Sequence, residues 1–163
     1  IPESVTNIAY RGLERIKYAI FESINPPKVG LSSTNTVNVG CKHNFVPPEA
    51  IDAYLVALNT AIPDGAHTAI EKVVYPHAIL ADDGANFVRA IDDGNYEIVL
   101  CDLANNTSII KNNKYTVGEN ITINGQPIVI TQIGKYAFRD GSTSTAVDNK
   151  GFRYEKYDIK QND

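Results

Sequence analysis

The residue types that could do chemistry in this chain begin with its histidines and cysteines, which are common ligands of zinc. His43 stands two positions after Cys41, whereas His67 and His77 follow much further along the chain. Ligands of a tetrahedral site normally form two clusters, each with an internal spacing of about two to five residues, and these four residues do not. We therefore interpret them as surface histidines and one buried thiol, and we expect no metal site.

A second candidate is a pair of acidic turns, Asp82-Asp83-Gly84 and Asp92-Asp93-Gly94, which recur ten residues apart. Paired carboxylates beside a glycine could hold a hard cation such as calcium. An EF-hand loop, however, needs a longer series of ligands that ends in a glutamate, and this series is absent. Because Asp-Gly is itself a favoured turn sequence, we interpret both segments as plain turns.

No catalytic motif is apparent in the chain. It has neither a glycine-rich phosphate loop nor the Gly-x-Ser-x-Gly turn that presents a nucleophilic serine. Catalytic triads assemble in space rather than in sequence, but here the three histidines are scattered and nothing singles out a nucleophile. We therefore expect that the protein is not an enzyme and needs no cofactor.

The composition indicates a folded protein. Its 163 residues suffice for one ordinary domain or two small ones, and an apolar content of 43% suffices for a core. A net charge of −4, with scattered Lys and Arg, argues against nucleic-acid binding. No apolar run approaches the roughly 20 residues that span a bilayer. The chain starts at Ile1 and contains no Met, which indicates a processed product or part of something longer.

The two cysteines, Cys41 and Cys101, leave two alternatives open. A disulfide between them would fit an oxidising compartment. Two buried thiols would fit any compartment, since cysteine is often buried as a small apolar residue. We place the buried thiols slightly ahead.

The elements that must position these residues begin with a helix near residues 48–62. Pro47 and Pro48 suit its start, because the first turn of a helix needs no partner for the missing amides. Apolar residues then recur at helical spacing, namely Ile51, Tyr54, Leu55, Leu58 and Ile62. Residues 68–75 suit a helix or a strand. From about residue 84 the pattern predicts strands, with hairpin turns at residues 92–95 and at Asn124-Gly125.

A nine-residue pattern occurs twice, once near each end of the chain. Residues 5–13 (VTNIAYRGL) align without a gap on residues 130–138 (ITQIGKYAF). Both sequences predict a short strand that ends at the Ile, a turn at the small residue, and a single helical turn that buries Leu13 or Phe138. Such a unit cannot bury its own apolar face and needs stacked neighbours.

Residues 130–138 closely resemble the core repeat of the BspA-like leucine-rich repeat family of bacterial surface proteins. Residues 1–8 resemble the start of another such repeat, and residues 17–54 resemble the way these arrays close. Residues 94–133 resemble the strand-rich segment that leads into a first repeat. The resemblance covers about 100 residues, in two blocks.

Two departures from the family pattern matter. In the first repeat Ala9 replaces the usual glycine and Gly12 replaces the usual alanine. The segment that resembles the end of a repeat array also comes first in the chain, and the segment that resembles the beginning of an array comes last. Each of these two half-arrays therefore leaves one apolar edge without a neighbouring repeat. These edges could pack on each other within one chain, could stack between subunits, or could belong to a segment cut from a longer chain.

We therefore expect an α+β, mostly β fold with partial leucine-rich-repeat units and a strand-rich hairpin module. Residues 1–65 would form a degenerate closing module, and residues 66–163 a strand-rich module that leads into a second repeat-like unit. The resemblance implies a non-catalytic, cell-surface or secreted module that binds a protein or a host-surface ligand. The alternative is a structural subunit that assembles head to tail with copies of itself. The expected binding or assembly surface contains Ile8, Tyr10, Leu13, Ile133, Tyr136 and Phe138.

Overall fold

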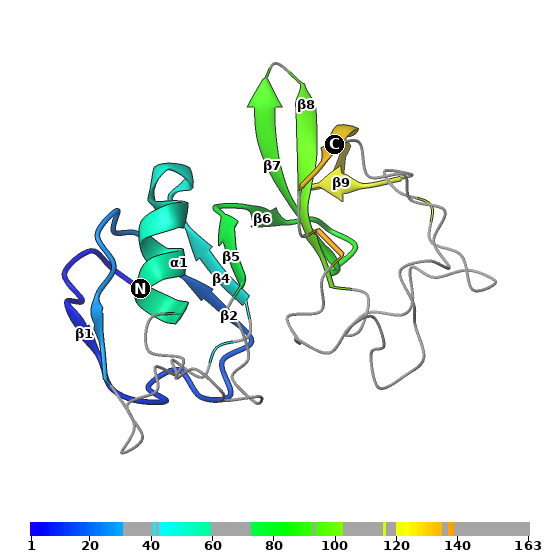
Figure 1. The fold of residues 1–163 in the computed structure, drawn as a ribbon. Coiled ribbons are helices and arrows are strands. Elements are labelled where there is room, and N and C mark those ends of the chain that lie inside the picture. The colour runs from blue at the N-terminus through cyan, green and yellow to red at the C-terminus, as the bar shows by residue number, and fades with distance from the viewer. Residues whose placement is uncertain are drawn as a thin grey trace. The chain divides into compact units, whose positions relative to one another are not determined.

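The computed structural model describes residues 1–30, 41, 43–59, 73–92, 94–102, 116, 120–134 and 137–138 (Figure 1). These ranges contain many short strands and one α-helix, which confirms the predicted α+β, mostly β class. The chain divides into two compact units, Ile1–His77 and Ala78–Asp163. The boundary predicted between residues 65 and 66 lies outside the described residues.

The first unit contains two parallel sheets between which the chain alternates. One sheet pairs β1 (Asn7–Ile8) with β3 (Lys28–Val29). The other has the order β2-β4-β5, formed by Tyr18–Ile20, His43–Val46 and Val73–Pro76. We call one passage of the chain through both sheets a circuit. β1, β2 and β4 each pair with a strand of the next circuit, namely β3, β4 and β5, so successive circuits stack side by side. This is the organisation of a solenoid, in which each repeat contacts its neighbours.

The single helix of the described ranges begins at the two prolines, as predicted. A 3-10 turn, η1 (Pro48–Ala50), leads into α1 (Ile51–Asn59). The last residues of the predicted range 48–62 lie outside the described residues. Of the predicted apolar stripe, Tyr54 and Leu58 are buried and the other described members are half-buried. The helix contacts β3 and β5, so it belongs to the third circuit of the solenoid.

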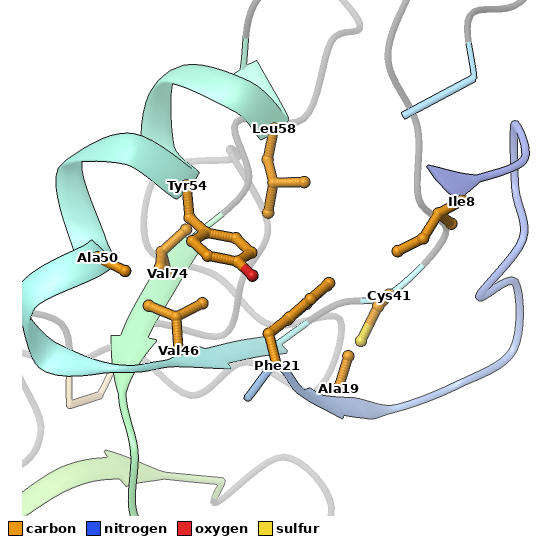
Figure 2. Close-up of a cluster of buried hydrophobic side chains, with 9 residues drawn as sticks. All are labelled: Ile8, Ala19, Phe21, Cys41, Val46, Ala50, Tyr54, Leu58 and Val74. Carbon is orange, nitrogen blue, oxygen red and sulfur yellow. The ribbon is translucent and has the colours of Figure 1, made fainter. Parts of the chain in front are cut away.

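The core of the first unit lies between the β2-β4-β5 sheet on one side and α1 together with Ile8 of β1 on the other, as Figure 2 shows. The rings of Phe21 and Tyr54 are tilted against each other with centroids 5.0 Å apart, a favourable aromatic geometry. The Tyr54 hydroxyl donates to the Ser23 carbonyl at 2.9 Å, so its polar end has a partner. Burial raises the pKa of Tyr54, because the charged phenolate is disfavoured there.

The second unit is built on a four-stranded sheet with the order β11-β8-β7-β6. In chain order its strands are β6 (Ile79–Leu80), β7 (Asn86–Asp92), β8 (Asn95–Cys101) and β11 (Val129–Ile133). β7 is antiparallel to both neighbours, whereas β11 runs parallel to β8. A separate hairpin pairs β9 (Thr122–Ile123) with β10 (Gln126–Pro127).

Both predicted hairpin turns are confirmed. Asp92 pairs with Asn95 across the end of β7 and β8, and Gly94 there has a φ of 80°. Asn124 and Gly125 have φ values of 50° and 75° between β9 and β10. Two consecutive positive φ values define the turn whose twist matches that of paired strands, and Asn-Gly is the sequence that adopts it most readily.

Cys41 and Cys101 are both buried thiols, in agreement with the alternative that was placed ahead. Cys41 belongs to the core of the first unit and Cys101 to the core of the second. Among the described ranges, no helix is long and apolar enough to cross a membrane.

Candidate functional site

The two predicted repeats share a strand and the hydrogen bond that closes the turn after it. In the first, which follows β1, the Gly12 amide donates to the Ala9 carbonyl at 2.7 Å. In the second, which follows β11, the Ala137 amide donates to the Gly134 carbonyl at 3.0 Å. The bonded residues occupy equivalent positions in the nine-residue alignment. The predicted strand and the turn after it are therefore confirmed in both repeats.

The apolar residue that ends each repeat packs on the core of its own unit. Leu13 is half-buried against the first core, and Phe138 is half-buried against the second. The single helical turn predicted before Leu13 is wrong, since consecutive tight turns take its place. Arg11 has a φ of 56°, which a right-handed helix cannot contain.

The other residues of the predicted surface also divide between the two units. Ile8 is buried in the first core, and Ile133 is half-buried against the second. Tyr10 is half-buried, and the guanidinium carbon of Arg11 lies 5.3 Å from the centroid of its ring. Tyr136 lies outside the described residues.

A third copy of the strand and its small residue was not recognised in the sequence. Lys28 and Val29 form β3 and pair in register with Asn7 and Ile8. Gly30 follows them at the position that Ala9 has in the first repeat, and its amide donates to the Ile8 carbonyl at 2.7 Å. The available signal was an apolar residue followed by glycine after paired prolines, which is too short to identify alone.

The residue directly after the repeat's strand is glycine in both repeats whose strand pairs with an earlier strand of the chain. A Cβ on Gly30 would lie 2.6 Å from the Tyr10 nitrogen. A Cβ on Gly134 would lie 3.0 Å from a Glu97 carboxylate oxygen and 3.1 Å from the Ile98 carbonyl. The equivalent residue after β1, a strand that pairs with no preceding strand among the described residues, is Ala9.

The prediction that the histidines lie on the surface is wrong for His43, whose exposure is only 1%. His43 begins the central strand of the β2-β4-β5 sheet and stands in a row of aromatic side chains. Its ring stacks on Tyr18, with centroids 5.7 Å apart, and lies 5.8 Å from Tyr75. His77 is half-buried, and its Nε2 lies at hydrogen-bond distance, 2.7 Å, from the Phe21 carbonyl. His67 lies outside the described residues.

The carboxylates of the first acidic turn bind the chain's own donors. Asp82 accepts hydrogen bonds from the Gly125 amide at 2.8 Å, the Thr122 hydroxyl at 2.7 Å and the Asn124 amide at 3.0 Å. The bond from Gly125 is the main reason why the pKa of Asp82 lies below its ordinary value. Asp83 accepts hydrogen bonds from the backbone amides of Ala85 and Asn86, both at 2.9 Å, just where β7 begins. The bonds to Asp82 join the acidic turn to the β9–β10 hairpin.

The buried Glu97 carboxylate is paired with a cation. Its side chain is 7% exposed, and it accepts a hydrogen bond from the Arg89 guanidinium on the neighbouring strand β7. The ion pair offsets part of the cost of burying this carboxylate and links β7 to β8.

Among the described residues, no group of three or more histidine, cysteine or acidic side chains is arranged to hold a metal ion. In comparisons with known proteins, no protein-family model, no curated protein and no solved structure matches the chain.

Proposed function

We propose that the chain is a non-catalytic binding or adhesion module, built on leucine-rich-repeat-like circuits and displayed on a cell surface or secreted. The observation that carries this proposal is the alternation of the chain between the β1-β3 and β2-β4-β5 sheets. Stacked circuits of this kind present extended surfaces that recognise a partner by shape. The BspA-like resemblance supports the surface location.

The polar groups of the described residues support a binding role over a catalytic one. Asp82 and Asp83 hold turns together, and Glu97 is paired with Arg89. The His77 ring is hydrogen-bonded to the backbone carbonyl of Phe21. A general base needs an oxygen or nitrogen that can reach a substrate proton, and each of these groups already serves the fold.

Exposed apolar side chains offer the contact area for such a partner. In the first unit Ile16, Ile24 and Val56 are 47%, 55% and 68% exposed. Ile16 and Ile24 flank β2, whereas Val56 lies on α1. Exposed aliphatic side chains of this kind can contribute to a protein interface once a partner covers them.

The proposal is tested by measuring binding of the chain to immobilised extracellular proteins, with albumin as the negative surface. We expect saturable binding to at least one of them that is lost after thermal unfolding. Ile16→Ser and Ile24→Ser should weaken the binding, while Ile91→Ser, an exposed apolar residue in the second unit, serves as the matched control. Turnover of a small substrate by the purified chain, without saturable protein binding, would contradict the proposal.

A second candidate function is a structural subunit that assembles head to tail through its two repeats. The observation that favours it is that β1 and β11, the strands of the two repeats, both stand at the edge of a sheet as far as the described residues extend. The partner is then a second copy of the chain.

A further inference from the structure

The two repeats each leave one side of a strand unpaired within the described ranges. β1 is one of two strands in its sheet, and β11 is the terminal strand in the order β11-β8-β7-β6. We call the side that pairs with no described strand the outer edge of β1 or of β11. Such an edge is a row of backbone amides and carbonyls that can pair with a further strand.

The outer edge of β1 presents the backbone of Asn7 and Ala9. Each residue of a parallel strand points its amide and its carbonyl to the same side, and the next residue points both groups to the opposite side. The Ile8 carbonyl accepts from the Gly30 amide at 2.7 Å, so Ile8 faces β3. Asn7 and Ala9, its neighbours in the chain, therefore face the other way.

The outer edge of β11 presents the backbone of Ile133. The Gly134 amide donates to the Ile98 carbonyl of β8 at 2.8 Å, so Gly134 faces β8 and Ile133 faces away from it. Ile133 is the residue that aligns with Ile8. Within the described residues, β11 pairs with a strand that precedes it in the chain and with none that follows it. β1 pairs with a strand that follows it and with none that precedes it.

We propose that β11 of one copy of the chain pairs in parallel with β1 of a second copy, a proposal that rests on the repeat scaffold inferred above. In this ladder the Ala9 amide donates to the Ile133 carbonyl, and the Ile133 amide donates to the Asn7 carbonyl. Ile133 then takes the role toward β1 that Ile8 takes toward β3. Because the two surfaces differ, the contact is heterologous, and each added copy leaves the same two edges at the ends of a growing chain.

On the copy that contributes β1, the incoming β11 pairs with β1 and does not extend to the neighbouring strand β2. The Ile1 amine donates to the Ile20 carbonyl, and the Glu22 amide donates to the Ile1 carbonyl at 3.0 Å. Ile1 therefore already lies along the end of β2, on the side away from β4. A strand from another copy meets exposed backbone beside β1 and not at this end of β2.

The methyl group of Ala9 weakens the pairing of β11 with β1, because it stands where the other repeats have glycine. The equivalent residue is glycine in both circuits that have a preceding strand, and a Cβ on Gly30 would lie 2.6 Å from the nitrogen of Tyr10. The Ala9 methyl points in the same way toward the incoming strand, which must shift to accept it. The structure therefore implies reversible association that rises with concentration.

The first test is a series at position 9, read as solution mass by light scattering. Ala9→Gly should raise the association constant about tenfold or more, because it removes the methyl group that overpacks the contact. Ala9→Val should lower it. Ala90→Gly and Ala90→Val make the same changes at an exposed alanine of β7 and should leave the mass unchanged. Circular dichroism of the same samples separates assembly of folded chains from aggregation of unfolded ones.

The second test fixes the register by disulfide formation. Asn7 and Gln132 are exposed and become direct neighbours in the proposed ladder. An equimolar mixture of Asn7→Cys and Gln132→Cys chains should form mixed dimers far in excess of either homodimer. The native cysteines are buried and do not compete. The positive control joins Asn7→Cys and Lys28→Cys in one chain, because these residues pair within the molecule.

The outcomes distinguish a failure of the proposed β11–β1 pairing from a failure of the repeat scaffold itself. If the Asn7–Lys28 disulfide forms but the mixture gives no mixed dimer, and Ala9→Gly keeps a mass near 17.8 kDa at all concentrations, the assembly is wrong and the scaffold stands. If the Asn7–Lys28 disulfide also fails, the scaffold behind the proposed function is wrong. An internal disulfide in a monomeric chain carrying both Asn7→Cys and Gln132→Cys would overturn the intermolecular pairing.

Discussion

Gly30 stands directly beside the backbone of Tyr10, so close that a Cβ on Gly30 would lie 2.6 Å from the Tyr10 nitrogen. This contact joins the first two circuits of the solenoid, since Gly30 follows β3 and Tyr10 follows β1. The absence of a side chain at Gly30 is therefore what lets the two circuits approach each other.

Gly30→Ala should destabilise the first unit by about 1–3 kcal/mol or more, because the new methyl meets backbone atoms that cannot move aside alone. Gly134→Ala should cost less, since the nearest atom to its Cβ is the end of the Glu97 side chain. Urea unfolding of both variants measures the two costs. An equal or reversed order would show that the close approach at Gly30 does not limit packing.

Phe21→Ala should destabilise the chain by about 3–5 kcal/mol, the usual cost of removing a buried phenylalanine. Phe21 is 1% exposed, and its ring contacts that of Tyr54. Val56→Ala on α1 is the control, because Val56 is 68% exposed, and it should change stability by less than about 0.5 kcal/mol. Similar losses in the two variants would place the core elsewhere.

Tyr54→Phe should change how stability depends on alkaline pH. Burial raises the pKa of Tyr54 in the folded state, so the stabilisation of the neutral phenol is fully present below about pH 10, the ordinary value. It is lost as the pH rises through the folded pKa. Urea midpoints from pH 7 to 11 should therefore fall less steeply for Tyr54→Phe.

The control is the difference in stability between the native chain and Tyr54→Phe at pH 7 to 9, where the phenol is neutral in both folded and unfolded chains. There the two proteins should differ by a constant amount that reflects the lost hydrogen bond to the Ser23 carbonyl, about 0.5–1.5 kcal/mol. Parallel curves up to pH 11 would mean that Tyr54 ionises in the unfolded and folded states alike.

Asp82→Asn should loosen the β9–β10 hairpin at neutral pH. The pKa of Asp82 is lowered in the folded state, so its stabilisation is present above about pH 4 and is lost as the pH falls through the folded pKa. The difference in urea midpoint between the native chain and the variant should therefore shrink in acid.

Glu3→Gln, a change at another exposed carboxylate, is the control for the general effect of removing a charge. Hydrogen exchange of the Asn124 and Gly125 amides gives a local readout, since both donate to Asp82. Unchanged exchange of these two amides in Asp82→Asn would contradict the role of Asp82 as the anchor of the hairpin.

Arg89→Met should destabilise the second unit, because it leaves the Glu97 carboxylate buried without its cation. Arg89 is about a third exposed, so water can replace part of the lost interaction and the cost should be about 1–3 kcal/mol. The double variant Arg89→Met with Glu97→Gln should recover part of it in a urea titration. Strictly additive losses would show that the pair is not coupled.

The amino-acid sequence by itself determined the elements that depend on neighbouring residues. The paired prolines and the apolar stripe specified the start and buried face of α1. The Asp-Gly and Asn-Gly turns specified two hairpins, because glycine and asparagine adopt positive φ at low cost. The nine-residue pattern specified two strands and the turns that follow them, since each unit is closed by its own local hydrogen bond.

Only the tertiary structure decided which strands pair and what they bury. β1 finds β3 about twenty residues later, and β11 lies parallel to β8, because strands of two to seven residues carry too little pattern to name a distant partner. The burial of His43 followed from the central place of β4 between two other strands. The need for glycine at position 30, and the consequence of alanine at position 9, likewise appear only when two circuits are stacked, since the limiting contact lies between backbones far apart in the chain.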